Sequence, residues 1–439
     1  MNRATAGVPP DNLRPARSRV GLILGLARNR RLAAVAALAA TLFYLVRGLG
    51  QLAGLPHADL TYDFGQFWNA ARALNLGTDP YAPFLKQCPV RFCPGPYIYS
   101  PLYAEMLRPL AALPLPVAGG ITLVLMQACV VASILLLHNL VRDWITTASK
   151  CWILAGTLLF FPLLQALFFI QVIPLLCALL AATAWLYVRG QETRAGLILG
   201  VAAVLRISPL LQLPALLVER RQLRRPFGVL AGVGCVGLLL LILAIATPRT
   251  AEFFSSVAPR LALGSPELDN VSPNGLLARL EVLAPGILPF SAARLAGAVS
   301  LVVVALTWWL ALGPTDAKRR ALVFAAFLAA APLVGSITEP YHLTTELLVI
   351  ALAAACLTPG SVAWWLALAS YPLMWVDGHI TNPLALSLGL ANPHGWRVPA
   401  FLLLTSSNLW GALLLWIACL LALARSRAPA GRLSESPGR

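Results

Sequence analysis

The sequence predicts an all-α polytopic membrane protein with about 12 transmembrane helices. Apolar residues make up 59% of the chain and charged residues 11%, against about 45–50% and about 25% in soluble domains. Many apolar residues lie in runs long enough to span a bilayer, which takes roughly 20 helical residues. The net charge of +16 comes largely from short basic clusters beside these runs, where such clusters set membrane orientation. Composition therefore indicates an embedded protein and does not indicate a nucleic-acid partner.

Both ends of the chain, residues 1–31 and 425–439, are polar and basic, which predicts two cytoplasmic tails. The first apolar run has no small-residue cleavage site after it, so we interpret it as a retained helix and not as a signal peptide. The alanine- and arginine-rich composition favours a bacterial plasma membrane. Between the tails, the transmembrane domain spans residues 32–424. Its predicted spans lie at about 32–55, 97–113, 117–141, two within 151–188, 195–218, 227–246, 291–312, 321–335, 346–358, 361–377 and 398–423.

The first external loop, residues 56–96, stands out because it is polar, aromatic and acidic. Apolar side chains recur at helical spacing from Phe64 onwards, which predicts a short helix over 63–76 on the membrane surface. The first residue of that helix would be a carboxylate, which the helix dipole favours. A helix cap is therefore the plain alternative to a catalytic role. The loop holds three of the 17 acidic residues within 21 positions: Asp59, Asp63 and Asp79.

Cysteine usage separates one pair from the rest. Six of the eight cysteines lie in apolar runs, where cysteine acts as a small hydrophobic residue. Cys88 and Cys93 instead lie close together in the first external loop. In an oxidising compartment they can form a disulfide, and two free thiols remain the alternative. No histidine lies near them in the sequence, so a zinc site is not indicated.

Two further segments are predicted on the external face: a long one at 247–290 and a short turn that ends in His342. Most basic residues fall in segments assigned to the cytoplasm, as the positive-inside rule requires. We therefore expect the functional site to face outward, between these two segments and the first loop. The carboxylates assigned to the outside are Asp59, Asp63, Asp79, Glu252, Glu267, Asp269, Glu281 and Glu339.

The motifs that the sequence lacks limit its chemistry. There is no phosphate-binding loop, no dinucleotide glycine fingerprint and no cluster of histidines and cysteines spaced for a metal. The external segments are too short to form a nucleotide-binding domain, since domains typically need about 50 residues or more. If the protein is a transferase, we expect a lipid-borne donor that reaches the site from the bilayer. No cofactor and no metal are expected.

Transfer of a sugar from a lipid phosphate needs few protein groups. The phosphate is a good leaving group, so one carboxylate suffices as the base for the acceptor hydroxyl in a single inverting displacement. Cationic or amide groups must then stabilise the departing phosphate. Asp63 is the candidate base, and Arg206, His342 and Arg279 are candidates for the phosphate or sugar side. Arg206 lies inside an apolar run, where a charge is costly and indicates function, unless it snorkels to the interface.

The first loop also carries a longer pattern, Asp63-Phe-x-x-Phe67-x-x-Ala70-Ala71-x-Ala73-Leu-x-x-Gly77-x-x-Pro80-Tyr81, followed by Tyr97-Ile-Tyr-Ser-Pro101-Leu-Tyr. This pattern resembles glycosyltransferase family 87, the polyprenyl-phosphate-mannose-dependent mannosyltransferases of the C-type membrane fold. Similar stretches follow in order along the chain. They are Gln171-Val-Ile-Pro174-Leu-Leu, Arg206-Ile-Ser-Pro209-Leu-Leu, Asp269-Asn270-Val-Ser272 through Leu280, and Tyr341-His342.

The resemblance implies a C-type glycosyltransferase fold with a helical first external loop. It also implies that Asp63 is the general base and that His342 lies at the active site. Some positions depart from the family pattern. Ile173 stands where the family often has asparagine, Arg206 replaces lysine, and Pro340-Tyr341 replaces a Trp-Asp pair.

Other side chains are candidates for contacts with the substrate. Aromatic rings can stack on sugars, although an aromatic belt at the membrane surface explains such rings as well. Amide side chains can hydrogen bond to sugar hydroxyls. The aromatic candidates are Tyr62, Phe67, Tyr81 and Tyr99, and the amide candidates are Gln171 and Asn270.

We therefore expect a membrane glycosyltransferase that moves a hexose, mannose in the first place, from a polyprenyl phosphate sugar to a glycolipid or polysaccharide acceptor. One alternative keeps this chemistry with an arabinofuranose or glucose donor. Another is a transporter or flippase for a lipid or a solute. A transporter is expected to show an internal repeat with paired broken helices, and no such repeat is visible in the sequence. A purely structural membrane subunit is disfavoured by the acidic first loop.

Overall fold

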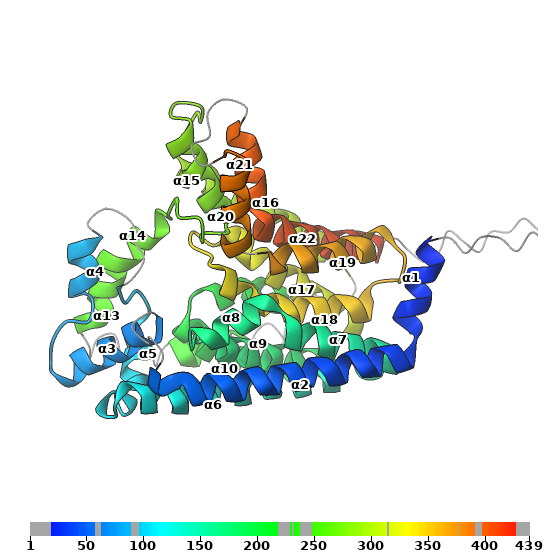
Figure 1. The fold of residues 1–439 in the computed structure, drawn as a ribbon, viewed down its shortest axis with the longest axis horizontal. Helices are drawn as coiled ribbons and strands as arrows, with labels where there is room; N and C mark the ends of the chain where they lie inside the picture. Colours follow the sequence, from blue (N-terminus) through cyan, green and yellow to red (C-terminus); the bar gives the residue numbers. More distant parts are fainter. Residues whose placement is uncertain are drawn as a thin grey trace, which may run out of the picture.

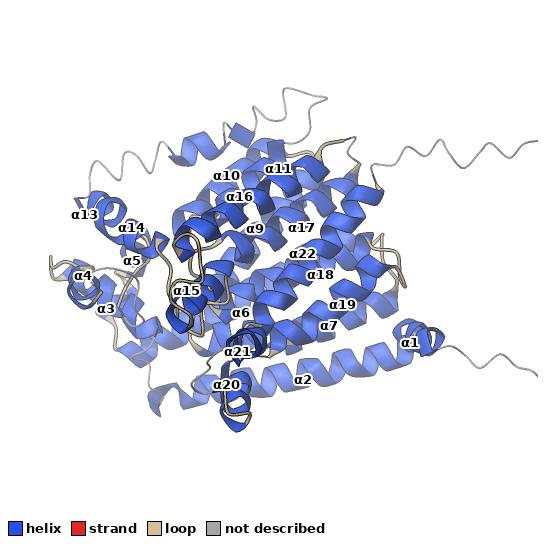
Figure 2. Ribbon diagram, turned by 90° about the horizontal axis from the view of Figure 1, so that it is seen from above, coloured by secondary structure: helices blue, strands red, loops and turns tan. Residues whose placement is uncertain are grey.

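The computed structural model describes residues 19–57, 63–88, 96–217, 229–230, 232–237, 248–313, 316–376, 378–390 and 397–426. Within these residues every regular element is helical and none is a strand. A bundle of helices makes up most of the protein, and Figures 1 and 2 show it from two sides. Its members are α2 (Arg30–Gly54), α6 (Leu115–Val141), α7 (Thr147–Leu159), α8 (Phe161–Phe168), α9 (Ile173–Val188), α10 (Glu192–Leu205), α16 (Ala292–Ala311), α17 (Ala317–Val334), α18 (Glu346–Cys356), α19 (Val362–Trp375) and α22 (Ser407–Arg425).

A group of short helices lies at one end of this bundle, and α1 (Arg19–Arg28) lies at the opposite end (Figures 1 and 2). The short helices come from two distant parts of the chain, before and after the central bundle helices. We call them the end group. They are α3 (Asp63–Asn75), α4 (Ala82–Gln87), α5 (Pro101–Leu107), α13 (Pro248–Glu252), the π-helical turn η4 (Phe253–Val257) and α14 (Ala258–Ala262).

The remaining elements connect or flank these two parts. In Figure 1, α15 (Pro273–Leu283), α20 (Gly378–Ser387) and α21 (Arg397–Thr405) stand out from the bundle at the top of the view. Short helical turns interrupt the bundle at several points. They are η1 (Leu55–His57), η2 (Leu110–Ala112), η3 (Ser208–Gln212) with α11 (Leu213–Leu217), and η5 (Pro340–Thr345).

The described helices fit a membrane protein. Four of them are long and apolar enough to cross a bilayer: Arg30–His57, α6, α16 and α22. A fifth is obtained if α7 and α8, which meet at 41°, count as one bent span. On α2, Val35, Val46 and Leu49 are more than 60% exposed, as expected for side chains that contact lipid. The total of 12 spans stays a prediction, since the predicted span at 227–246 lies mostly outside the described residues.

Two predicted spans differ from the observed helices. The segment 97–113 is not one helix: α5 has seven residues, too short to cross a bilayer core of about 30 Å. Prolines at positions 101 and 109 explain this, because proline cannot donate the backbone hydrogen bond that continues a helix. The predicted span 398–423 is divided at Ser406, where α21 ends and α22 begins.

The first-loop helix matches its prediction closely. The helix α3 begins at Asp63 and ends at Asn75. Phe64 and Phe67 are both 2% exposed, so the apolar face is the buried one. Gly77 follows with φ of +70°, a conformation that glycine adopts without the strain a side chain would add.

Three breaks in the bundle helices occur at the end that carries the end group. The first separates α8 from α9, the second follows α10 at Arg206, whose backbone is extended (φ −155°, ψ 139°), and the third separates α17 from η5. Irregular backbone at membrane depth is tolerated where it is buried in protein or lines a cavity. All three breaks contribute residues to the site described next.

Candidate active site

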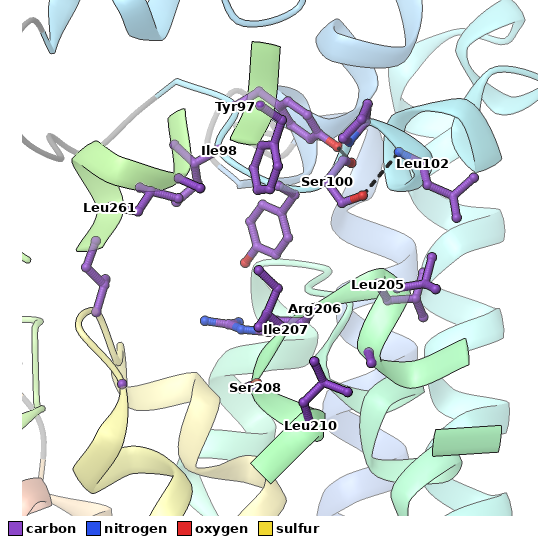
Figure 3. A pocket seen from close by; sticks show the side chains of 18 of the residues that line it. Tyr97, Ile98, Ser100, Leu102, Leu205, Arg206, Ile207, Ser208, Leu210 and Leu261 are labelled. Carbon is purple, nitrogen blue, oxygen red and sulfur yellow. Dashed lines mark hydrogen bonds between the residues drawn. The ribbon is translucent and has the colours of Figure 1, made fainter. Parts of the chain in front are cut away.

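A cavity of about 1250 Å³ lies between the end group and the bundle. It is larger than the 300–1,000 Å³ of typical small-molecule pockets. Figure 3 shows the Arg206 side chain extending into it, with Ile98 and Leu261 on one wall and Ile207 and Leu210 on another. Residues from α3, the segment 96–102, the α10–η3 break, α13–α14 and the turn 335–342 contribute to the lining.

Asp63 lines this cavity as the first residue of α3. Burial raises the pKa of its carboxyl group above the usual value, and a hydrogen bond with the Gln171 side chain opposes that shift. The positive end of the α3 dipole also favours the charged form. The carboxylate therefore keeps its charge in a partly desolvated position, where it is a stronger proton acceptor than a solvated aspartate.

Tyr99 connects Asp63's partner to the cationic side of the cavity. Its hydroxyl donates to Gln171 Oε1 at 3.2 Å. Its ring packs edge-to-face on Phe67, with centroids 4.9 Å apart, and the Arg206 Cζ atom lies 5.8 Å from the ring centroid. Tyr99 and Phe67 both line the cavity. Gln171 is 1% exposed and lies behind this wall.

The backbone at Gln171 has an unusual neighbour. Ile170 is buried and has φ of +52°, a region that β-branched residues rarely occupy. The turn that results brings the Gln171 N–H to Ala166 O at 2.8 Å. Backbone strain of this kind costs about 1–3 kcal/mol and is concentrated at functional sites. Here it fixes the direction of the side chain that hydrogen bonds to Asp63.

Arg206 and His342 meet on the other side of the cavity. Arg206 Nη2 and His342 Nδ1 are 3.2 Å apart. The backbone N–H of Glu339 donates to the same Nδ1 at 2.8 Å. Because Nδ1 accepts hydrogen bonds, the ring proton of a neutral His342 is on Nε2. Within the described residues, neither this Nε2 nor Arg206 Nη1 has a hydrogen-bond partner, so two buried donors remain for a ligand.

Glu339 is a cavity residue that the sequence did not single out. Its side chain accepts the Tyr341 hydroxyl and forms a capping box with His342 at the start of η5. Its Oε2 lies 3.8 Å from His342 Nε2. Burial, and then the charge of Asp63, raise the pKa of Glu339 to about 8, against the opposing effect of Arg206. Its predicted external position beside His342 was the one signal that could have identified it.

Tyr81 does not line the cavity, contrary to the stacking role expected for it. It is 0% exposed, and its hydroxyl donates to Tyr99 O at 2.8 Å. Its ring packs between Tyr97 and Phe253, with centroid distances of 5.7 and 5.9 Å. Tyr81 therefore supports the aromatic wall from behind. Tyr62, the remaining aromatic candidate, lies outside the described residues.

Asn270 is also remote from the cavity surface. It is 2% exposed, and its Nδ2 donates to Ser336 O at 3.0 Å. Its Oδ1 accepts from the backbone N–H of Thr338 at 3.1 Å and from the Ser272 hydroxyl at 2.8 Å. These bonds fix the turn that leads into Glu339. Asn270 is placed to position the site and not to contact a substrate.

Arg279 holds the same network from α15. Its Nη1 donates to Glu267 O at 2.7 Å and to Asn270 O at 3.1 Å, and its Nη2 donates to Ser406 Oγ at 3.2 Å. Burial lowers the pKa of Arg279 to about 10, which still leaves it charged at neutral pH. Its donors are directed at protein groups, in contrast to the role on the phosphate side expected from the sequence.

The cysteines and possible metal ligands complete the inventory. Cys88 is disulfide-bonded, and Cys93 lies outside the described residues. The other six cysteines are free thiols. No group of three or more histidine, cysteine, aspartate or glutamate side chains is arranged for a metal ion among the residues that the structure describes.

Comparison with known proteins decides the family. The model of glycosyltransferase family 87 matches residues 97–336, more than half of the chain. The chain belongs to glycosyltransferase family 87. This family 87 protein is accordingly a membrane glycosyltransferase of the C type. The matched range includes Tyr99, Gln171 and Arg206, whereas Asp63 and His342 lie outside it. No curated protein matches the chain.

Proposed function

We propose that this family 87 glycosyltransferase moves a hexose, mannose in the first place, from a polyprenyl phosphate sugar to a glycolipid or polysaccharide acceptor. The observation that carries the proposal is the composition of the cavity. It combines a desolvated carboxylate, Asp63, with two unpartnered donors, on Arg206 and His342, in one space. These are the groups that sugar transfer from a lipid phosphate requires.

In this mechanism Asp63 is the general base. The acceptor hydroxyl approaches the anomeric carbon from the face opposite the phosphate, and Asp63 removes its proton as the new bond forms. One displacement inverts the anomeric configuration, so a β-linked donor gives an α-linked product. Gln171 and the start of α3 hold the carboxylate in its charged form.

Arg206 and His342 bind the phosphate. Arg206 Nη1 and His342 Nε2 are buried donors without partners in the described part of the chain. A phosphate oxygen between them would receive both hydrogen bonds, and a buried donor left without a partner costs about 1–3 kcal/mol. Because negative charge grows on the phosphate as the sugar departs, these donors stabilise the transition state more than the ground state.

The apolar part of the lining suits a prenyl chain. Ile207, Leu210 and Phe254 line the cavity and are each at least 39% exposed. A nucleotide donor would instead need polar contacts for its base and ribose. We therefore assign the apolar wall to the lipid part of the donor, which would enter from the bilayer.

We also propose the topology of about 12 spans, with the cavity on the external face of a bacterial plasma membrane and both termini in the cytoplasm. The basic residues support this orientation. Arg28, Arg30 and Arg31 lie in or beside α1, which is at the end of the bundle opposite the end group (Figure 1). Basic residues concentrate on the cytoplasmic side of membrane proteins.

The donor sugar is the least constrained part of the proposal. Arabinofuranose or glucose on the same lipid phosphate would use the same carboxylate and the same phosphate donors. The transporter that the sequence left open is disfavoured by the family match. A panel of lipid-phosphate sugars is therefore part of the test.

The experiment uses membranes that contain the wild type, Asp63→Asn or the control Asp143→Asn. Polyprenyl phosphate mannose labelled in its sugar is the donor, and an extract of native lipids is the acceptor. Asp143 is 82% exposed and is paired with Arg142 at 3.6 Å, so its variant makes the same chemical change outside the cavity. We expect label in a new glycolipid with the wild type and the control.

For Asp63→Asn we expect a loss of at least about 100-fold, the usual contribution of a general base. Full activity in a folded Asp63→Asn protein would move the base elsewhere, with Asp59 as the next residue to test. No transfer by the wild type from any sugar in the panel would contradict the proposed function.

A further inference from the structure

Glu339 is a second carboxyl group in the cavity, and the reaction proposed above gives it no role. It lies in the lining together with Asp63, Arg206 and His342. It comes from the turn between α17 and η5, whereas Asp63 comes from the end group. The hydrogen bonds of Asn270 to Ser336 and Thr338 hold this turn in place.

The groups that face Glu339 come from every element around it. Asp63 on α3 and Asp269 before α15 carry negative charge towards it, and Arg206 after α10 carries positive charge. Tyr99 also interacts with it electrostatically. On its own turn, Tyr341 donates to it and His342 is neutral with its proton on Nε2. Two carboxylates and one guanidinium thus share a desolvated space.

Two carboxyl groups in such a space do not ionise together easily. The structure decides which one stays charged. Asp63 receives the hydrogen bond from Gln171 and begins a helix, and both favour its anion. Glu339 is more strongly affected: its pKa rises to about 8. At neutral pH the cavity therefore holds a charged Asp63 and a neutral Glu339.

We propose that Glu339 is a further catalytic residue: as a neutral carboxylic acid it donates a hydrogen bond to the phosphate oxygen that leaves the sugar. This inference rests on the proposed function and adds a third donor to those of Arg206 and His342. The neighbouring donors place the phosphate beside Glu339, since His342 Nε2 lies 3.8 Å from Glu339 Oε2.

The step balances without another reactant. The bond between the anomeric carbon and the phosphate oxygen breaks, the bond to the acceptor oxygen forms, and the acceptor proton goes to Asp63. The phosphodiester monoanion becomes a phosphomonoester dianion. The second pKa of a phosphomonoester is about 6, below that of Glu339 at about 8, so the proton stays on Glu339. It stabilises the developing charge through a hydrogen bond and is ready for the next turnover.

A purely structural role would also use the contacts of Glu339. Its side chain caps η5 and accepts the Tyr341 hydroxyl, and glutamine can keep both contacts through its amide oxygen. Glutamine also keeps a donor, but it does not titrate. The pH profile therefore separates catalysis from structure, whereas loss of activity alone does not.

The experiment measures initial rates of transfer from pH 6 to pH 9.5 with the purified wild type, Glu339→Gln and Glu339→Ala. We expect the wild-type rate to fall as pH rises through about 8, because Glu339 ionises and its donor is lost. The Gln variant should keep at least about a tenth of the wild-type rate at pH 7 and lose this alkaline decline. The Ala variant should lose about 10²–10³-fold, as for removal of one transition-state donor.

An unchanged alkaline decline in Glu339→Gln, or wild-type rates in Glu339→Ala, would overturn the inference. A second measurement does not depend on transfer: binding of a short prenyl monophosphate to each protein as a function of pH. The wild type should bind more weakly above pH 8 and the Gln variant should not. If the wild type shows this pattern but transfers no sugar, the proposed function fails and the role of Glu339 towards phosphate stands. Binding that does not depend on pH in the wild type would contradict that role.

Discussion

Two buried arginines at opposite ends of the bundle show how the same side chain serves structure and function. Arg319, 5% exposed, donates from Nη2 to Leu310 O at 3.1 Å, at the end of α16. Its Nη1 donates to Leu423 O at 3.3 Å, near the end of α22. It thereby satisfies carbonyl groups that two helix ends leave without partners. Arg206 instead follows a helix that ends early, and its Nη1 has no partner in the described residues.

The difference teaches that burial alone does not identify a functional arginine. Both side chains are costly to place in an apolar setting. Arg319 recovers that cost through backbone carbonyls, as its contacts with α16 and α22 show. Arg206 leaves one donor in a cavity that also holds Asp63. The accounting of hydrogen bonds, donor by donor, is what separates the two roles.

The largest expected effect sharpens this comparison at the functional end. Arg206→Gln should lower the rate of transfer by about 10²–10³-fold, because a donor to the departing phosphate is removed. The unfolding temperature should change little, since Nη1 stabilises no protein group. Rates and thermal unfolding of the same purified sample provide the check. A large drop in unfolding temperature with unchanged rates would assign Arg206 to structure.

Arg319→Gln should show the opposite pattern. Several carbonyls lose a donor, and we expect the free energy of unfolding to fall by about 1–3 kcal/mol. The rate per folded molecule should match the wild type. Thermal unfolding in detergent, followed by rate measurements on the folded fraction, tests this. Loss of transfer by a fully folded Arg319 variant would break the comparison.

A smaller effect is expected from Gln171→Leu. The wild-type rate should fall at low pH, because Asp63 must be ionised and its pKa is raised by burial. Since the hydrogen bond of Gln171 favours the anion, its loss raises the pKa of Asp63 further, and the acid limb moves to higher pH. At pH 7 the rate should fall by less than about tenfold. An acid limb that stays in place would contradict the contact between these side chains.

The smallest effect concerns the wall behind the cavity. Tyr81→Phe removes one buried hydrogen bond, to Tyr99 O, and should lower the free energy of unfolding by about 0.5–1.5 kcal/mol. Transfer should change little, because Tyr81 does not line the cavity. Stability and the KM for the donor, measured together, check this. A large rise in KM would restore the direct sugar contact that the sequence suggested.

Local features of this protein could be predicted well from the sequence. The helix that begins at Asp63 follows from its apolar spacing, and its end follows from Gly77. The break near Pro209 was also expected, although the chain leaves the helix at Arg206, slightly earlier. Short-range sterics and hydrogen bonding determine such features, so a single sequence contains the information.

Features that depend on distant contacts could not be predicted in this way. No pattern places Glu339 in the same cavity as Asp63, or turns Arg279 away from the site towards Ser406. Ile170 adopts a positive φ that its residue type disfavours, and only the surrounding packing explains it. The aromatic content of 97–113 suggested a span, but its prolines limit α5 to seven residues.

The stereochemistry of transfer tests the central claim most directly. Purified protein in a bilayer disc would receive a β-linked polyprenyl phosphate mannose and a lipid acceptor, and the anomeric configuration of the product would be read by NMR. The account predicts an α-linked product from the wild type and none from Asp63→Asn. A β-linked product, or equal yield from Asp63→Asn, would contradict single-step inversion with Asp63 as the base.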